Sequence, residues 1–213
     1  MPNYRRHLPH QIPEGTPIFV TWNLKGAIPT AVAERLRSER AWLEKQPRKP
    51  GESPRDRALR IGKLLFARTD AYLDGATAGP LHLQTPECAK IVEDAILFSA
   101  AERVELLAWC VMANHVHALF TPIWEYVRLM QSIKGFTSRQ INQLQSQTGR
   151  TLWQDESYDH WVRDEAELLR IIHYIEQNPV KAGLCAKAED WPWSSARFRA
   201  VGQAFSLTET PKR

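Results

Sequence analysis

The chain has 213 residues, of which 43% are hydrophobic and 24% are charged, and it carries a formal net charge of +4. This length is enough for one well-buried domain, and no apolar run reaches membrane-spanning length. The three cysteines are odd in number and lack a Cys-x-x-Cys spacing, which argues against a disulfide framework or a zinc ribbon. The positive charge favours a polyanionic partner. The first residues lack the pattern of a secretory signal, so we expect a cytoplasmic protein without a membrane partner.

Hydrophobic periodicity predicts a chain of mixed strands and helices. Period-two alternation over residues 17–24 predicts a first strand, with Val20 and Trp22 on one face and Thr21 on the other. Further elements are expected as helices over 30–46, 54–73, 85–101, 124–147 and 165–178 and as a strand over 104–112. Pro179 is expected to end the last helix.

A third strand, after residue 114, carries two histidines one residue apart. Because side chains alternate along a strand, His115 and His117 must project to the same face, while Val116 and Ala118 project to the other. Two neutral imidazoles side by side on a rigid strand form two legs of a divalent-metal site. The alternative is a structural histidine pair, so the metal site depends on support from elsewhere in the chain.

The helix over 165–178 places a phenol and an amide on one edge. At 100° per residue, Tyr174 and Asn178 fall together on the flank of the apolar stripe, about one turn apart. If this helix docks beside the histidine strand, both side chains can face the metal. The alternative for Tyr174 is an ordinary tyrosine at the edge of a packed stripe. Tyr158, in a polar stretch that we expect to be a loop, is the rival nucleophile.

Basic residues suited to phosphate contact occur in two places. Lys134 and Arg139 give the helix over 124–147 a basic side, for which a solvated surface is the alternative. The N-terminal 15 residues are polar and proline-containing and read as an irregular arm with a basic tip at Arg5 and Arg6, or as a disordered tail.

In combination, these segments resemble the REP-associated tyrosine transposases, a family within the HUH superfamily of single-strand DNA endonucleases. The segments that carry the resemblance are Tyr4-Arg5-Arg6, the stretch from Trp109 to His117, the stretch from Ile133 to Thr137, the block from Leu152 to Leu184, and Trp191-Pro192-Trp193-Ser194-Ser195. They cover most of the chain apart from roughly residues 35–85. Their ordered combination is specific, although each segment alone is weak.

The resemblance implies an enzyme and a mechanism. In that family the two histidines bind Mg²⁺ or Mn²⁺, and a helix tyrosine attacks the scissile phosphate, leaving a 5′-phosphotyrosine link and a free 3′-hydroxyl. Carried onto this chain, the ligands are His115 and His117 and the nucleophile is Tyr174. The implied activity is metal-dependent cleavage and rejoining of single-stranded DNA at hairpins formed by palindromic repeats. Tyr4, Arg5 and Arg6, with the basic helices, are then candidates for contact with the hairpin stem.

Two departures from related enzymes bear on the metal site. Insertion-sequence relatives place a glutamine four residues after the tyrosine as a third ligand, whereas this chain has Asn178, one methylene shorter. Glu167, two turns earlier on the same helix, is a weaker alternative ligand. The turn before the histidines has Ala113 where relatives often have proline, which affects rigidity more than chemistry.

The expected fold is α+β, with an antiparallel sheet in ferredoxin-like order, helices on one face and the histidine pair on the other. We expect residues 1–213 to form a single transposase-like HUH domain, with 35–85 as a helical insertion. A domesticated hairpin-binding protein without cleavage is the alternative function. An unrelated metallohydrolase is disfavoured because no acidic residue follows the histidines at 118–120. The sequence leaves monomer and homodimer open.

Overall fold

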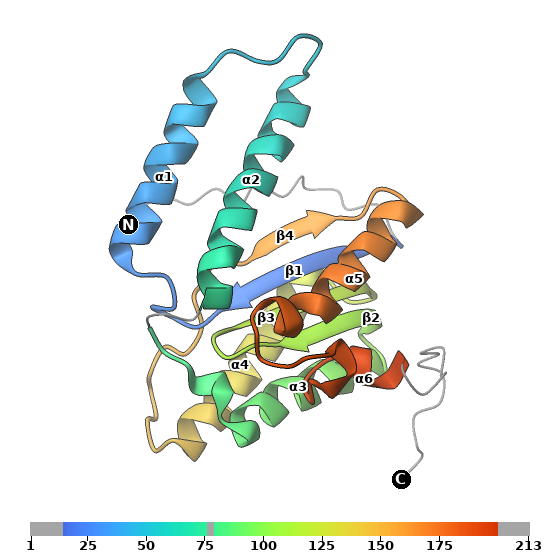
Figure 1. Cartoon of the computed structure of the whole chain (residues 1–213). Helices are drawn as coiled ribbons and strands as arrows, with labels where there is room; N and C mark the ends of the chain where they lie inside the picture. The colour runs from blue at the N-terminus through green and yellow to red at the C-terminus, as the bar shows by residue number, and fades with distance from the viewer. Residues whose placement is uncertain (1–14, 76–78, 200–213) are drawn as a thin grey trace.

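The computed structural model describes residues 15–75 and 79–199 (Figure 1). The elements in chain order are β1 (Ile18–Asn23), α1 (Thr30–Lys45), α2 (Pro54–Gly75), η1 (His82–Gln84), α3 (Pro86–Ala100), β2 (Val104–Val111), β3 (His115–Pro122), α4 (Tyr126–Leu144), β4 (Tyr158–Trp161), α5 (Glu165–Lys181), η2 (Ala188–Asp190) and α6 (Ala196–Arg199). No helix in these described ranges is long and apolar enough to cross a membrane.

The four strands form one antiparallel sheet in the order β2-β3-β1-β4. This order is the ferredoxin-like one, in which the first and third strands of the chain occupy the centre. The predicted α+β fold is therefore confirmed. The central position of β3 fixes the histidines, because β3 is hydrogen-bonded on both sides, to β1 and to β2.

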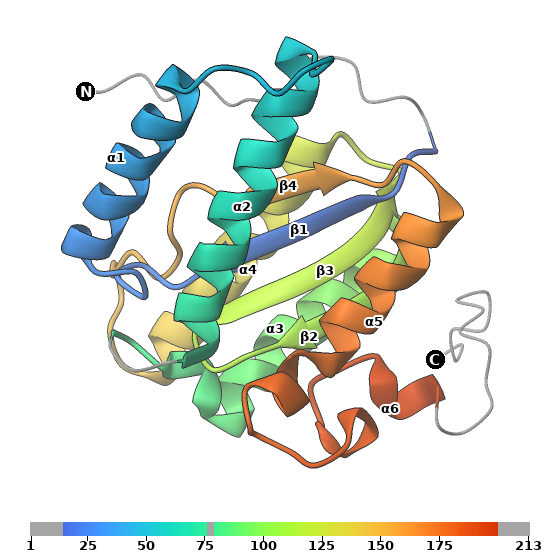
Figure 2. The same ribbon diagram turned by 45° about the horizontal axis from the view of Figure 1, so that its top comes forward.

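The sheet buries both of its faces (Figure 2). One face, which includes Val20 and Val116, packs on α3 and α4 in the larger apolar cluster. The other face, which includes Phe19 and Leu119, packs on side chains of α2 and α5 in a smaller cluster. The alternation expected for β1 and β3 is thus confirmed. Helices cover both faces of the sheet and not one as expected, because α2 and α5 pack on the histidine face.

Two local features differ from the sequence-based expectation. Residues 158–161, expected as a loop, form β4, which pairs with β1. Such a short strand on a polar background gives too little alternation to be recognised, and its pairing with β1 determines its conformation. The last helix continues past Pro179 to Lys181. Gly183 follows this end, and its φ of +71° allows its N–H and that of Leu184 to bond back to carbonyls of the last turn.

Between β1 and α3 the chain forms a helical hairpin, α1 and α2, seen at the top of Figure 1. Helix α1 has no buried residue, whereas α2 buries Ile61, Leu65 and Leu73. The guanidinium of Arg57 on α2 donates to carbonyl groups at the end of α1, including that of Leu43 at 2.8 Å. The hairpin is therefore attached to the sheet through α2.

Candidate active site

The two histidines of β3 lie at the centre of the buried sheet. His115 pairs with Asn23 and His117 with Thr21 of β1, and both histidine side chains have 0% exposure. Their Nε2 atoms lie 3.0 Å apart. Two ligands in adjacent positions of an octahedral Mg²⁺ or Mn²⁺, each bonded at about 2.1 Å, are separated by about 3 Å. The spacing of the pair thus suits a shared divalent ion.

Neighbouring side chains orient both imidazole rings. Nδ1 of His115 lies 2.7 Å from Oδ1 of Asn114, and the amide nitrogen of Asn114 donates to the carbonyl of Leu73 at 3.1 Å. Because that amide oxygen can only accept, Nδ1 of His115 carries the proton and Nε2 presents its lone pair. Nδ1 of His117 is likewise bonded to Oγ1 of Thr21 at 2.7 Å. Metal-binding histidines are commonly held in this way, through the nitrogen that does not face the metal.

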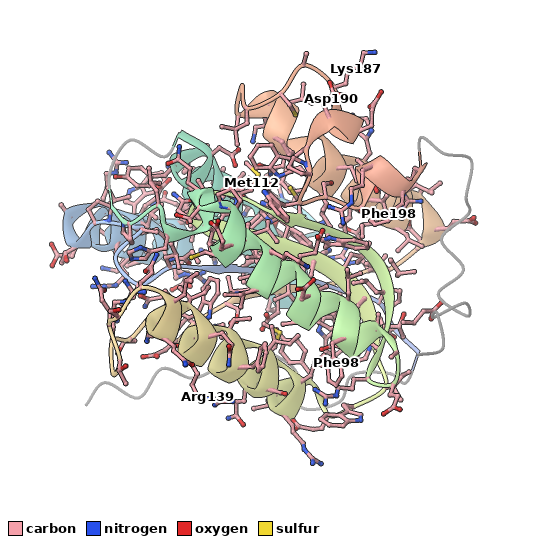
Figure 3. All side chains as sticks on the ribbon, turned by 90° about the horizontal axis from the view of Figure 1, so that it is seen from below. Phe98, Met112, Arg139, Lys187, Asp190 and Phe198 are labelled. Atoms are coloured by element: carbon pink, nitrogen blue, oxygen red, sulfur yellow. The ribbon has the colours of Figure 1, made fainter. Side chains whose placement is uncertain are left out.

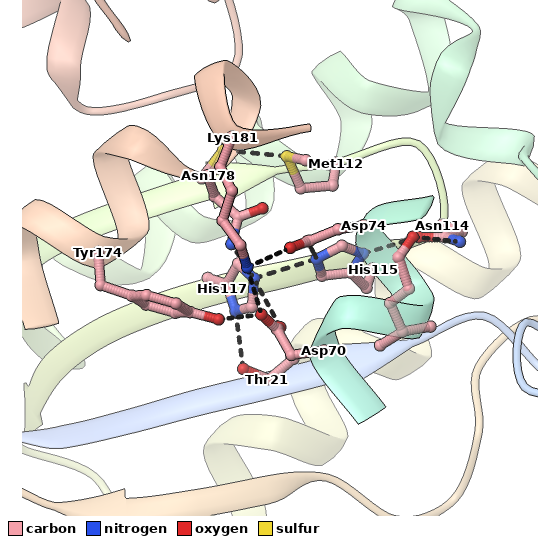
Figure 4. Close-up of polar contacts among 12 residues, drawn as sticks. Thr21, Asp70, Asp74, Met112, Asn114, His115, His117, Tyr174, Asn178 and Lys181 are labelled. Carbon is pink, nitrogen blue, oxygen red and sulfur yellow. Dashed lines mark hydrogen bonds and ion pairs between the residues drawn. The ribbon is translucent and has the colours of Figure 1, made fainter. Parts of the chain in front are cut away.

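Helix α5 brings its predicted side chains to the same point (Figure 4). Asn178 has 0% exposure, and its amide nitrogen lies 3.1 Å from Nε2 of His117. Its Oδ1 has no hydrogen-bond partner among the described residues. Rotation of the amide group by 180° exchanges these two atoms, which would present the oxygen to the histidines. The Tyr174 ring lies 5.6 Å from the His117 ring, centroid to centroid. The structure thus brings together His115, His117, Tyr174 and Asn178.

Helix α2 adds two carboxylates that sequence reasoning missed. Oδ1 of Asp70 lies 3.4 Å from Nε2 of His117, and Oδ1 of Asp74 lies 3.7 Å from Nε2 of His115. A signal for Asp70 exists in the sequence: it lies four residues after Phe66 and three before Leu73, on the same side of α2 as both. A carboxylate on a buried helix face requires a partner, and here that partner lies more than 40 residues away.

The donor set fits a hard divalent cation. His115, His117, Asp70 and Asp74 each offer one ligand atom, and these atoms lie within 4.8 Å of one another. Among the described residues, Oδ1 of Asp70, Oδ1 of Asp74 and Oδ1 of Asn178 are buried without a hydrogen-bond partner. Oxygen and imidazole donors are the ligands that Mg²⁺ and Mn²⁺ accept. A cation at this point would satisfy the two aspartate oxygens, and it would satisfy the oxygen of Asn178 once that amide group is rotated.

Burial and local charge determine the protonation states of the site. Burial lowers the pKa of His115 well below its ordinary value and that of His117 to about 3, so both rings are neutral at pH 7. Burial raises the pKa of Asp70, and burial together with the charge of Asp70 raises the pKa of Asp74 to about 6. The ammonium of Lys181 lies 2.6 Å from Oδ2 of Asp74 and offsets part of this negative charge.

The two alternatives considered for the site lie differently from expectation. Glu167 is at the start of α5, where it bonds to Lys63 at 2.7 Å and to His160 at 3.0 Å. Tyr158 lies in β4, and its ring stacks on Phe66 at 3.9 Å. Burial raises the pKa of the Tyr158 phenol, as it does that of Tyr174, so the pKa does not distinguish the two phenols.

Of the predicted DNA-contacting residues, the structure describes Lys134 and Arg139, both on α4. Lys134 donates to the carbonyls of Gln154 and Asp155 at 3.0 and 3.3 Å and so holds the loop before β4. Arg139 is exposed on α4, on the side of the sheet away from the histidines (Figure 3). Tyr4, Arg5 and Arg6 lie outside the described residues.

Comparison with known proteins finds one family model that matches part of the chain. Residues 85–178 match the model of the family described as "Transposase IS200 like". The chain is 30% identical over 102 residues to a provisionally named REP-associated tyrosine transposase of Haemophilus influenzae, covering 43% of this chain and 58% of that protein. It is 30% identical over 95 residues to the REP-associated tyrosine transposase of Escherichia coli K12, covering 43% of this chain and 53% of that protein. The aligned regions thus span just over half the length of these relatives.

A solved structure supports the fold over the full length. A REP-associated tyrosine transposase bound to a REP hairpin aligns with a TM-score of 0.54 and 20% sequence identity, covering 100% of this chain and 98% of that one. The family match begins after α2 and ends at Asn178, so it contains both histidines and Tyr174 but neither Asp70 nor Asp74. Together these matches show that the chain is similar in sequence to REP-associated tyrosine transposases, that residues 85–178 match the IS200-like transposase family, and that the fold is shared with the solved structure.

Proposed function

We propose that this chain is a metal-dependent endonuclease and transposase of the HUH type, which cleaves and rejoins single-stranded DNA through a covalent bond to Tyr174. The observation that carries the proposal is the position of Tyr174, whose ring lies 5.6 Å from that of His117 and whose phenol bonds to Asp70 beside the histidine pair. A nucleophile next to a divalent-cation site is the arrangement that metal-assisted phosphoryl transfer needs. The match of residues 85–178 to the IS200-like transposase family supports the same function.

We assign His115, His117 and Asn178 as ligands of Mg²⁺ or Mn²⁺. The bound ion supplies positive charge that polarises the scissile phosphate. Thr21 and Asn114 keep the two imidazoles turned toward the ion through their bonds to Nδ1. Since both histidines are neutral at pH 7, metal binding does not have to displace a proton from either ring.

The proposed reaction is a transfer of the phosphoryl group to Tyr174. The phenol oxygen forms a bond to phosphorus, while the bond from phosphorus to the 3′ oxygen of the preceding nucleotide breaks. The phenol loses its proton and the departing 3′ oxygen gains one, which gives a 5′-phosphotyrosine and a free 3′-hydroxyl. Attack by a 3′-hydroxyl on that linkage reverses the step. Because the phosphodiester energy is kept in the tyrosine link, rejoining requires no nucleotide cofactor.

Tyr174 needs assistance to act as the nucleophile. Burial and the charge of Asp70 raise the pKa of its phenol above the ordinary value near 10. The phenol is therefore protonated at neutral pH in the metal-free site. A neighbouring cation favours the phenolate, so we propose that attack depends on the metal.

We propose that the substrate is a DNA hairpin of a palindromic repeat, in agreement with the hairpin bound by the structural neighbour. Arg139, as an exposed cation, and the arm with Tyr4, Arg5 and Arg6 are the proposed contacts to the hairpin backbone. We propose that Lys134 contributes by fixing the loop 154–157. In this proposal residues 1–213 act as one domain, with 35–85 inserted into it.

A covalent-adduct assay tests the function. End-labelled single-stranded hairpin oligonucleotides from repeats near the gene are mixed with the protein and Mg²⁺ or Mn²⁺ and run on a denaturing gel. We expect a metal-dependent adduct on the fragment that carries the 5′-phosphate, lost in Tyr174→Phe and His115→Ala and retained in the control Tyr158→Phe. An adduct that persists in Tyr174→Phe contradicts the assignment. Salt-sensitive hairpin binding without any adduct would favour a non-cleaving hairpin-binding protein instead.

A further inference from the structure

We propose that α2 is a working part of the active site, in which Asp70 and Asp74 complete the metal site and Asp70 also positions the phenol of Tyr174. This inference rests on the proposed function and deepens it. It assigns a role to two residues that lie outside the segment matched by the transposase family, 85–178. In this proposal the α1–α2 hairpin supplies side chains to the active site and is more than a structural insertion.

Each carboxylate has one oxygen engaged and one oxygen directed at the histidine pair. Oδ2 of Asp74 accepts from Lys181 at 2.6 Å, and Oδ2 of Asp70 accepts from the Tyr174 phenol. The Oδ1 atoms of both aspartates lack a hydrogen-bond partner among the described residues. A buried acceptor without a partner costs free energy, so its orientation toward two imidazoles requires a reason.

A cation supplies that reason. Nδ1 of His115 carries its proton toward Asn114, so Nε2 of His115 has no hydrogen to donate to Asp74. The contact of 3.7 Å between Nε2 of His115 and Oδ1 of Asp74 therefore joins two acceptors. Two acceptors that face one another in a buried site repel unless a positive charge lies between them. A divalent metal bound to both atoms resolves this contact.

Asp70 connects the metal site to the nucleophile. One of its oxygens lies 3.4 Å from Nε2 of His117, while the other holds the phenol of Tyr174. The Tyr174 ring is further confined by Phe19, at 5.9 Å between centroids, and by Phe66, at 6.4 Å. A single carboxylate thus fixes the distance between the phenol oxygen and the site of the ion, which is the geometry that in-line attack depends on.

Helix α2 is held firmly enough to position these groups. The carbonyl of Leu73 accepts from the side chain of Asn114, which also orients His115. At the other end of the contact, Lys63 pairs with Glu167 of α5 at 2.7 Å. Ile61 and Leu65, two residues before and after Lys63, are also buried. Rigid support of this kind is required when a functional side chain must be held within about 0.5 Å.

Mn²⁺ binding to the full-length protein without DNA tests the ligand role. Titration calorimetry and the electron paramagnetic resonance signal of free Mn²⁺ are compared for wild type, Asp70→Asn and Asp74→Asn. The control is Asp94→Asn on α3, an exposed residue whose carboxylate pairs with Lys90 at 2.8 Å. We expect the Mn²⁺ affinity to fall at least ten-fold in both site variants and to stay unchanged in the control. The unfolding midpoint of each variant without metal checks that the variant is folded. We expect it to be, because the replacement amide has nearly the same shape as the carboxylate.

The adduct rate at saturating Mn²⁺ tests the positioning role. We expect this rate to fall more than ten-fold in Asp70→Asn and less in Asp74→Asn, because only Asp70 contacts Tyr174. Mn²⁺ affinities within two-fold of wild type in both folded variants overturn the ligand role, and equal saturating rates in both overturn the positioning role. If the wild-type protein forms no adduct, but both variants bind Mn²⁺ more weakly than wild type does, the proposed function fails while the ligand assignment stands.

Discussion

Thr21 lies directly opposite His117 in the β1–β3 ladder, and its hydroxyl lies 2.7 Å from Nδ1 of that histidine. Both side chains are buried, at 5% and 0% exposure. The hydroxyl can accept the proton of Nδ1, which leaves the lone pair of Nε2 directed into the site. The orientation of His117 is therefore set by a residue 96 positions away in the chain.

Replacement of Thr21 by valine should weaken metal binding while the fold is kept. Valine has nearly the same shape as threonine but cannot bond to Nδ1, so the imidazole loses its fixed orientation. We expect Mn²⁺ affinity to fall by about ten- to hundred-fold. The free energy of unfolding should decrease by about 1–3 kcal/mol, because a buried ring nitrogen loses its partner. Calorimetry and urea unfolding measure the two effects. Thr21→Ser, which keeps the hydroxyl, should retain most of the affinity, and equal losses in both variants would contradict this role.

Metal affinity should depend on pH through the carboxyl groups of α2. Burial and the charge of Asp70 raise the pKa of Asp74 to about 6, above its usual value of 3.8. Below pH 6 the folded protein holds a proton on Asp74 that a bound metal must displace, so affinity should rise between pH 5 and pH 7 and then level off. His117 does not titrate in this window, because burial lowers its pKa to about 3.

The same raised pKa of Asp74 predicts how the stability of the metal-free protein changes with pH. Between pH 4 and pH 6 the folded chain keeps a proton on Asp74 that the unfolded chain has lost, so this group makes the protein less stable as pH rises. Asp74→Asn should remove that contribution, and it should also flatten the pH dependence of Mn²⁺ affinity. Calorimetric titrations and urea unfolding at pH 5, 6 and 7 measure both. An unchanged pH slope in the variant would rule out Asp74 as the titrating group.

The packing of α5 should be sensitive to Ile175. This side chain has 0% exposure and lies in the smaller apolar cluster, next to Tyr174 in the sequence. Ile175→Ala should lower the free energy of unfolding by about 2–5 kcal/mol, since it removes buried methyl groups and leaves a cavity. The matched control is Leu169→Ala on the same helix, where the side chain is 60% exposed. Its effect should stay within about 0.5 kcal/mol, and similar losses in both would contradict the docked face of α5.

The docking of α2 should depend on Phe66. Its ring stacks on Tyr158 at 3.9 Å and meets Phe19 edge-on at 5.5 Å. Phe66→Ala should raise amide hydrogen exchange across residues 54–75 by about ten-fold or more, because loss of the aromatic contacts and their burial costs more than about 1.4 kcal/mol. Exchange in β1 and β3 should change less. Leu64→Ala, at an exposed position of the same helix, is the control. Equal exchange rates in Phe66→Ala and Leu64→Ala would show that Phe66 does not hold α2.

Local patterns predicted the elements whose faces differ in polarity. Alternation along β1 and β3 assigned His115 and His117 to one face, because the period of a strand is fixed by its geometry. The spacing of Tyr174 and Asn178 placed both on one helix edge for the same reason. The strand β4 was not predicted, because so short a strand depends on its pairing with β1. The end of α5 was predicted at Pro179 and not just before Gly183, because a helix end depends on the hydrogen bonds of the residues that follow it.

The sequence by itself determined the α+β class, the shared face of the histidines and the shared edge of Tyr174 and Asn178. Each of these follows from the repeat of a single element. Only the tertiary structure decided that α2 crosses the histidine face, and so brought Asp70 to Tyr174 across 104 residues and Asp74 to His115. The charged residues of α2 read locally as a solvated basic helix. The apolar side of that helix follows from its period, but its packing on the histidine face of the sheet is set by long-range contacts, which no local period encodes.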